Sequence, residues 1–350
     1  MSTPRYQWQP TTAEIAARIG VPVQDVIRFD HNTSPFPSDW APAVVTEAAR
    51  HLNEYPGADY RPIREAAAKY IGVDPDAVVP GAGIDELIFL ATRALAPSGG
   101  IVAAASPTYP LYRIAAVQQH CRFLEVPLLS PDFAFPRDAL LGAARDADLV
   151  WLCIPNNPTG NRIDEDLLTD TLAAAGGVVV IDAAYAEFAS DDWGPWVERH
   201  QNLLVMHTLS KGFGLAGARV GYAVGVPELI DAIDGVRPPG SISSLSVDLA
   251  TAALDEPNRM RRRVDRLNKQ RSRLGSELDQ LHMTVLPSSA NFVLCLVGDS
   301  AHGLATALLE DGLVVRTFPE GSALADYLRF TVRAPEENDR LLAALWGALP

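Results

Sequence analysis

The sequence contains few cysteines and no apolar run long enough to cross a membrane. Its cysteines are an odd number and lie far apart in apolar contexts: Cys121, Cys153 and Cys295. This pattern predicts reduced core residues rather than a disulfide framework or a metal site. The first residues also lack the apolar region of a secretory signal. We therefore expect a soluble, cytoplasmic protein that binds no metal.

Basic residues are scarce as well. Lysine and arginine together number 29 against 43 aspartates and glutamates, which gives a formal net charge of -14. That charge would repel a phosphate polymer or an anionic membrane, so neither is expected as a partner. It is still compatible with a local basic pocket for one small anion. The arginine-rich run at 259–266 is expected to be a solvated helix face with acidic partners.

Seven short apolar runs alternate with helical patterns in the middle of the chain. They cover residues 77–80, 100–105, 121–126, 148–154, 177–182, 202–207 and 220–224. Hydrophobic strands without an alternating polar face, separated by helices, are typical of a mainly parallel sheet covered on both sides. The pattern therefore predicts an α/β fold with a mainly parallel seven-stranded sheet.

The pattern changes after residue 240. The stretch P-P-G-S-I-S-S at 238–244 marks a break, and a long helical region follows it to about Leu281. Short strands and helices then alternate to the end of the chain, which indicates a smaller α+β lobe. We expect a large domain at 48–242 and a small domain made of 1–47 and 243–350, in which the N-terminal arm packs on the C-terminal lobe.

Polar side chains follow three of the predicted strands. Asn157 comes shortly after the run at 148–154, Asp182 ends the next run, and Lys211 follows the run at 202–207. Ligands of open α/β sheets bind at the carboxyl ends of the strands, so these side chains are expected to converge. Lys211 could be a turn residue, a phosphate ligand or a covalent amine catalyst. No G-x-x-x-x-G-K-[ST] pattern precedes it, and its polar neighbours at other strand ends disfavour a simple turn.

These residues resemble the fold-type I pyridoxal-phosphate (PLP) aminotransferases, and within them the histidinol-phosphate aminotransferase group. The resemblance covers nearly the whole chain. The matching motifs are N-E-Y-P-G (53–57), G-A-G-I-D-E-L (81–87), P-T-Y (107–109), P-N-N-P-T-G (155–160), D-A-A-Y (182–185), S-K-G-F-G-L-A-G-A-R-V-G (210–221), V-V-R (314–316) and L-R-F-T-V (328–332). The lysine motif, with an arginine eight residues later, is the most specific of them.

The resemblance implies a role for each residue at the strand ends. Lys211 would form the internal Schiff base and move the proton between substrate and cofactor, which a lysine of lowered pKa can do. Asp182 would keep the pyridine nitrogen protonated, so that the ring accepts electrons. Asn157 and Tyr185 would hydrogen-bond the ring oxygen, and Tyr109 would stack on the ring face.

The cofactor phosphate is expected at the start of the helix that follows the G-A-G turn, where backbone N–H groups and the helix dipole favour an anion. Its ligands would be Gly83, Ile84, Asp85, Ser210, Arg219 and, more weakly, Thr208. In this family Tyr55 reaches the phosphate from the other subunit. The resemblance therefore implies a homodimer.

Arg316 and Arg329 match the family's anion-binding arginines, whose planar guanidinium can pair with either a carboxylate or a phosphate. Asn157, Tyr109 and Asn32 would also contact the substrate. Several positions depart from the family pattern and leave the substrate open. Ala183 replaces an acid, Ile84 is bulkier than the usual residue, Thr33 and Ser34 change an N-E-N-P motif, and Trp8 stands where the arm usually places a tyrosine.

Histidinol-phosphate aminotransferase, working with 2-oxoglutarate and glutamate, is the first functional hypothesis. An aromatic amino-acid aminotransferase on the same scaffold is the second, because Trp8 would favour a larger apolar ring. A PLP-dependent decarboxylase of a phosphorylated amino acid is the third. A regulator of the same fold would need an added DNA-binding module, for which this acidic chain has no room.

Overall fold

The computed structural model describes residues 5–348 and contains one large and two small sheets. The large sheet consists of β2 (Val78–Gly81), β3 (Ile101–Ser106), β4 (Arg122–Pro127), β5 (Leu149–Cys153), β6 (Val178–Asp182), β7 (Leu203–Thr208) and β8 (Gly221–Gly225). Its order is β2-β8-β7-β6-β5-β3-β4, and β8 runs antiparallel to both of its neighbours while the other pairs are parallel. The predicted seven-stranded, mainly parallel sheet is therefore confirmed.

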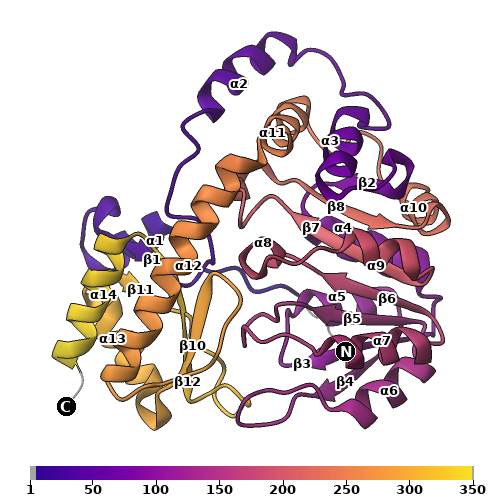
Figure 1. Ribbon diagram of the computed structural model, residues 1–350. Coiled ribbons are helices and arrows are strands. Elements are labelled where there is room, and N and C mark those ends of the chain that lie inside the picture. The colour runs from indigo at the N-terminus through magenta and orange to yellow at the C-terminus, as the bar shows by residue number, and fades with distance from the viewer. Residues whose placement is uncertain (1–4, 349–350) are drawn as a thin grey trace.

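Helices flank this sheet in the way that its buried strands require (Figure 1). They are α3 (Arg61–Ile71), α4 (Ile84–Leu95), α5 (Leu111–Gln118), α6 (Arg137–Asp146), α7 (Glu165–Ala174), α8 (Ala186–Ala189), α9 (Gly194–Arg199) and α10 (Pro227–Asp234). Strands β5, β7 and β8 are buried along their whole length. The continuous apolar runs in the sequence reflect this cover on both faces.

The C-terminal lobe has an antiparallel sheet of order β12-β10-β9. Its elements are β9 (Thr284–Val285), β10 (Phe292–Leu296), α13 (Ala301–Glu310), β11 (Leu313–Val314), β12 (Tyr327–Thr331) and α14 (Pro335–Ala348). Short 3-10 turns lie at Val23–Asp25, Ala49–His51, Pro75–Ala77, Ala216–Ala218 and Gly298–Ser300.

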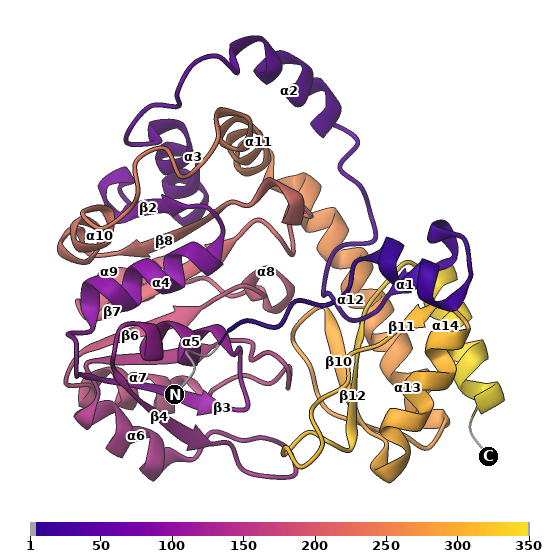
Figure 2. The same cartoon turned by 180° about the vertical axis from the view of Figure 1, so that it is seen from behind.

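The N-terminal arm packs on this lobe, as expected. It contains α1 (Thr12–Ile19), which begins with a capping box between Thr11 and Glu14, and β1 (Ile27–Arg28), which pairs in parallel with β11. The chain before α1 then crosses from the small lobe towards the large one (Figure 2). The arm thus joins both parts of the molecule, while the division into domains at 48 and 242 stays a prediction.

The long helical region after residue 240 is two helices rather than one. They are α11 (Ser244–Asp255), which packs on α3 and on α2 (Ala41–Ala48), and α12 (Pro257–Gln280), which crosses to the small lobe (Figure 1). Between them, Glu256 has a φ of -121° and a ψ of 56°. A residue before proline is pushed out of the helical region, and Pro257 has no N–H to continue the first helix.

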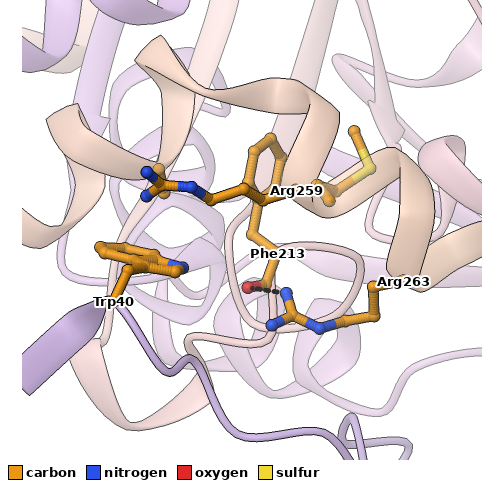
Figure 3. Close-up of a pocket in the computed structure, with 6 residues that line it drawn as sticks. Trp40, Phe213, Arg259 and Arg263 are labelled. Atoms are coloured by element: carbon orange, nitrogen blue, oxygen red, sulfur yellow. Dashed lines mark hydrogen bonds between the residues drawn. The ribbon is translucent and has the colours of Figure 1, made fainter.

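Two arginines of the run at 259–266 have partners other than those expected. Arg259 lies over the ring of Trp40 at 5.4 Å, and Arg263 donates to the Phe213 carbonyl at 2.6 Å (Figure 3). Arg263 also donates to the Ser38 hydroxyl. Within residues 5–348 neither arginine forms an ion pair with an acid. The expectation of acidic partners was wrong here, because the aromatic arm segment before α2 lies against this helix.

The three cysteines are buried and unpaired, as predicted. Over the described part of the chain, the structure contains no helix that is both long and apolar enough to cross a membrane.

Candidate active site

The carboxyl ends of β5, β6 and β7 bring the predicted polar residues to one edge of the large sheet. Asp182 is the last residue of β6 and pairs with Met206 of β7, while Asn157 and Lys211 lie in the loops after β5 and β7. All three strands run in the same direction, so these side chains share one edge.

Lys211 lies between the sheet edge and the N-terminal arm. Its Nζ donates to the carbonyl of His31 at 3.2 Å. Burial lowers the pKa of the amine to about 8, and the positive charges of Arg329 and Arg219 act in the same direction. A larger fraction of this amine is therefore unprotonated near neutral pH than in an ordinary lysine, which suits a nucleophile or a base.

Asp182 is buried below the edge. It accepts a hydrogen bond from the Tyr112 hydroxyl and one from the Ala184 N–H at 3.1 Å. Burial raises the pKa of Asp182 to about 6, while these two hydrogen bonds oppose the rise. The carboxylate is therefore ionised at neutral pH and available to a protonated ring nitrogen.

Tyr112 is a site residue that the sequence analysis missed. Its ring stacks on Trp151 with centroids 4.7 Å apart, which fixes the hydroxyl that bonds to Asp182. Tyr112 lies in α5, whereas Tyr109 precedes that helix, so no helical spacing linked the two residues in the sequence.

The start of α4 forms a cradle for an anion. Gly83 has a φ of +83°, and a Cβ there would lie 2.7 Å from Nη2 of Arg219. Glycine is therefore required both by the backbone and by the close approach of the guanidinium. The first N–H groups of α4, at Ile84 and Asp85, have no partner within the helix. Arg219 lies beside them and pairs with the Asp85 carboxylate at 2.8 Å.

Two hydroxyl groups complete the cradle. Thr208 donates to Ser210 at 3.0 Å, and both side chains are buried. Together with the helix N–H groups and the guanidinium, these groups match the acceptor oxygens of a phosphate dianion. The six residues predicted to bind the phosphate within one chain lie at the start of α4, at the end of β7 and in the loop that follows β7.

The position of Trp8 differs from the expectation. The side chain of Trp8 is 84% exposed, and it contacts Tyr6 edge to face. Tyr6 instead lies against Tyr109, with ring centroids 6.2 Å apart. Arg28 donates to the Pro10 carbonyl and so anchors the arm at this proline. With the chain held there, Tyr6 rather than Trp8 is the aromatic residue of the arm that lies against Tyr109, and a contact of Trp8 with the substrate stays a prediction.

The hydroxyl groups of Tyr109 and Tyr185 each form a hydrogen bond with another polar residue of the site. Tyr109 donates to Asp85 at 2.9 Å, and Tyr185 accepts from the Asn32 amide at 3.0 Å. Asn32 also accepts from Thr331 of β12 at 3.0 Å. The buried Asn32 therefore links the C-terminal lobe to the loop after β6.

Arg329 of β12 is the buried cation of the site. Its guanidinium donates to the Asn157 side chain at 2.5 Å and to the Asp30 carbonyl at 2.7 Å. Burial lowers the pKa of Arg329 to about 10. Arg316 pairs with Arg329 across an antiparallel bridge, which starts both side chains on one face. The two arginines predicted to bind anions are thus neighbours.

Tyr55 lies away from this site in the same chain. It is 96% exposed, in the loop between α2 and α3. A ring that contacts a second copy of the chain must be exposed in the single chain, and Tyr55 meets this condition.

The donor set fits one cofactor. A buried carboxylate and an amine of lowered pKa lie at one edge of the sheet, and the start of α4 at Gly83, beside the Arg219 guanidinium, could hold a phosphate. This fold and this arrangement define a pyridoxal-phosphate-dependent enzyme of fold type I. The chain belongs to the aminotransferase class I and II family, whose pattern matches residues 24–345. It is therefore a PLP-dependent aminotransferase.

Several relatives share most of the chain's length. It is 39% identical over 319 residues to the histidinol-phosphate aminotransferase of Methylibium petroleiphilum, covering 88% of this chain and 85% of that protein. It is 35% identical over 332 residues to histidinol-phosphate aminotransferase 2 of Archaeoglobus fulgidus, covering 93% of both. Among solved structures, histidinol-phosphate aminotransferase from Sinorhizobium meliloti in complex with pyridoxal-5'-phosphate matches with a TM-score of 0.89 and 27% identity. That match covers 98% of this chain and 95% of the other.

We predict that Lys211 is the most reactive lysine of the cofactor-free protein at pH 8. Lys69 and Lys269, both exposed, are the only other lysines and serve as internal controls. At pH 8 an amine of pKa about 8 is half unprotonated, whereas an ordinary lysine is less than about 1% unprotonated. Acylation mapped by mass spectrometry between pH 6.5 and 10 measures this. A midpoint near 10.5 at Lys211 would show that its surroundings do not lower its pKa.

Proposed function

We propose that the protein is a histidinol-phosphate aminotransferase. It exchanges the amino group of histidinol phosphate for the keto oxygen of 2-oxoglutarate and yields imidazole acetol phosphate and glutamate. The observation that carries this proposal is the pair Arg316 and Arg329. The two residues are opposite each other in an antiparallel bridge, and the charge of Arg329 acts on Lys211. Guanidinium groups pair with phosphate and with carboxylate, so one pocket serves both substrates. The relatives named above support the same choice.

Lys211 is the proposed proton carrier. The bound cofactor supplies a ring that accepts the electron pair left when the substrate carbon loses its proton. The Lys211 Nζ would take that proton from the substrate carbon and deliver it to the cofactor carbon. This transfer requires an amine that is neutral for part of the cycle. Its lowered pKa supports this role.

The remaining cofactor ligands act through charge and hydrogen bonds. Asp182, ionised at neutral pH, would hold the proton on the ring nitrogen, and Tyr112 keeps that carboxylate oriented. Tyr185 and Asn157 would bond the ring oxygen, and Tyr109 would cover the ring. The Gly83 cradle would hold the phosphate. A cytoplasmic location stays a prediction of the sequence.

An aromatic amino-acid aminotransferase is the second candidate. Tyr6 supports it, because it adds an aromatic wall to the site against Tyr109. The decarboxylase is less supported, since the family match is to aminotransferases. The test below separates all three activities.

We predict that histidinol phosphate alone bleaches the visible absorbance of the holoenzyme and that 2-oxoglutarate restores it. The Arg329→Ala variant should lose about 100-fold or more in kcat/KM for both anionic substrates, because a buried charged hydrogen bond is removed. Stopped-flow absorbance measures both half-reactions. Reaction with phenylalanine or tyrosine but not histidinol phosphate would identify the aromatic enzyme. Carbon dioxide release without an oxo acid would identify a decarboxylase.

We propose further that the enzyme is a homodimer in which Tyr55 reaches the cofactor phosphate of the opposite protomer. Its exposure in the single chain supports this, as does the exposed apolar surface of Val45 and Leu52 nearby. The interface would then complete both active sites.

We predict that hybrid dimers of Tyr55→Ala and Lys211→Ala chains recover cofactor affinity. The Tyr55→Ala homodimer should bind the cofactor about tenfold more weakly, through the loss of one hydrogen bond to a charged group. In a hybrid, the site with an intact Lys211 receives an intact Tyr55 from the other chain. Activity measured against cofactor concentration tests this. If Tyr55 acts within its own chain, the hybrid will keep the weak affinity of the Tyr55→Ala homodimer.

A further inference from the structure

His31 lies beside the catalytic lysine, and none of the roles described so far uses its imidazole. Its carbonyl accepts the hydrogen bond from Lys211 at 3.2 Å. The neighbouring Asp30 and Asn32 are 4% and 2% exposed, whereas 38% of the His31 side chain is exposed. The imidazole is therefore an accessible titratable ring next to the site, held between two buried residues.

A buried ion pair fixes one side of this ring. The Arg28 guanidinium bonds to both oxygens of the Asp30 carboxylate, at 2.8 and 2.7 Å. The His31 Nε2 contacts Nη2 of Arg28 and lies 3.5 Å from Oδ2 of Asp30. A guanidinium has donors only, so a neutral His31 must accept at Nε2 and carry its hydrogen on Nδ1.

The charges around His31 favour an anion. Arg28, Lys211 and Arg329 all lower the pKa of the ring, in addition to burial, and Asp30 alone opposes them. The Asp30 carboxylate is already paired with Arg28, so the one acid that acts on the ring is engaged by a guanidinium, while Lys211 and Arg329 add positive charge beside it. A neutral ring that offers an N–H to this region suits an oxyanion.

We propose that His31 is a specificity-determining residue of the substrate pocket, where its Nδ1–H donates to an oxyanion of the bound substrate. The oxyanion is a phosphate oxygen of the amino donor or a carboxylate oxygen of glutamate. This inference rests on the proposed function only in requiring an anionic substrate. When the ring is protonated, Nε2 also carries a hydrogen, and the nearby Asp30 carboxylate can accept it.

The first test compares half-reactions of the holoenzyme. In His31→Gln, which keeps a side-chain amide of similar reach, and in His31→Ala, we expect a weaker apparent affinity for one substrate by about tenfold, with a smaller effect in the Gln variant. The maximal rate of the half-reaction should change little. Loss with histidinol phosphate alone assigns the phosphate, and loss with glutamate alone assigns the carboxylate. His302→Gln, an exposed histidine on α13, is the matched control.

The second test needs no turnover. NMR of ring-labelled histidines in the holoenzyme follows the His31 signal, which is assigned by its absence in His31→Gln. We expect a pKa below the usual value without added anion, and a rise of roughly one unit when inorganic phosphate is added. The His302 signal should not respond.

These outcomes separate this inference from the proposed function. A wild-type enzyme that reacts with glutamate but not histidinol phosphate contradicts the proposed donor, while the glutamate arm and the phosphate titration still test His31. Unchanged affinity for both substrates in both His31 variants, or a His31 pKa that does not move with phosphate, overturns the assignment.

Discussion

The buried guanidinium of Arg329 holds the site together. It bonds to Asn157 of the large sheet and to the carbonyl of Asp30 in the arm, and its backbone pairs with Arg316. A buried charge needs partners, so neither the Asn157 loop nor the arm can move away from β12 without removing a partner of this guanidinium. The same charge helps to lower the pKa of Lys211. The Arg329 guanidinium thus joins several parts of the site, and it adds to the effect of burial on the pKa of Lys211.

The two sides of the site divide the chemistry. The large sheet carries the proposed cofactor residues, since Asp182, Lys211 and the Gly83 cradle all lie in it or in its loops. The arm and the C-terminal lobe carry the proposed substrate residues, namely Arg316, Arg329 and His31. Replacing residues of the arm can therefore change the substrate while the cofactor side stays intact.

The large sheet was predictable because its strands are buried on both faces and read as uninterrupted apolar runs. The meeting of Asn157, Asp182 and Lys211 at its edge was predictable for a related reason, since parallel strands bring their ends together. The two-residue strand β1 was not separable from a loop by its pattern. The break between α11 and α12 had a signal in Pro257 that the helical periodicity outweighed.

The residues from the arm could not be placed from local sequence. Tyr6, rather than Trp8, meets Tyr109 because Arg28 anchors the chain at Pro10, a contact 18 residues apart. His31 gained its position through a contact with Lys211, 180 residues away. Such long-range contacts depend on how the lobes pack, which no short motif specifies.

The measurement that tests the central claim most directly is borohydride reduction of the holoenzyme, followed by peptide mapping. The account predicts that the cofactor mass is found on the peptide of Lys211 alone, because Lys211 is the proposed covalent amine among only three lysines. Cofactor on Lys69 or Lys269, or an active enzyme with no cofactor attached after reduction, would contradict it.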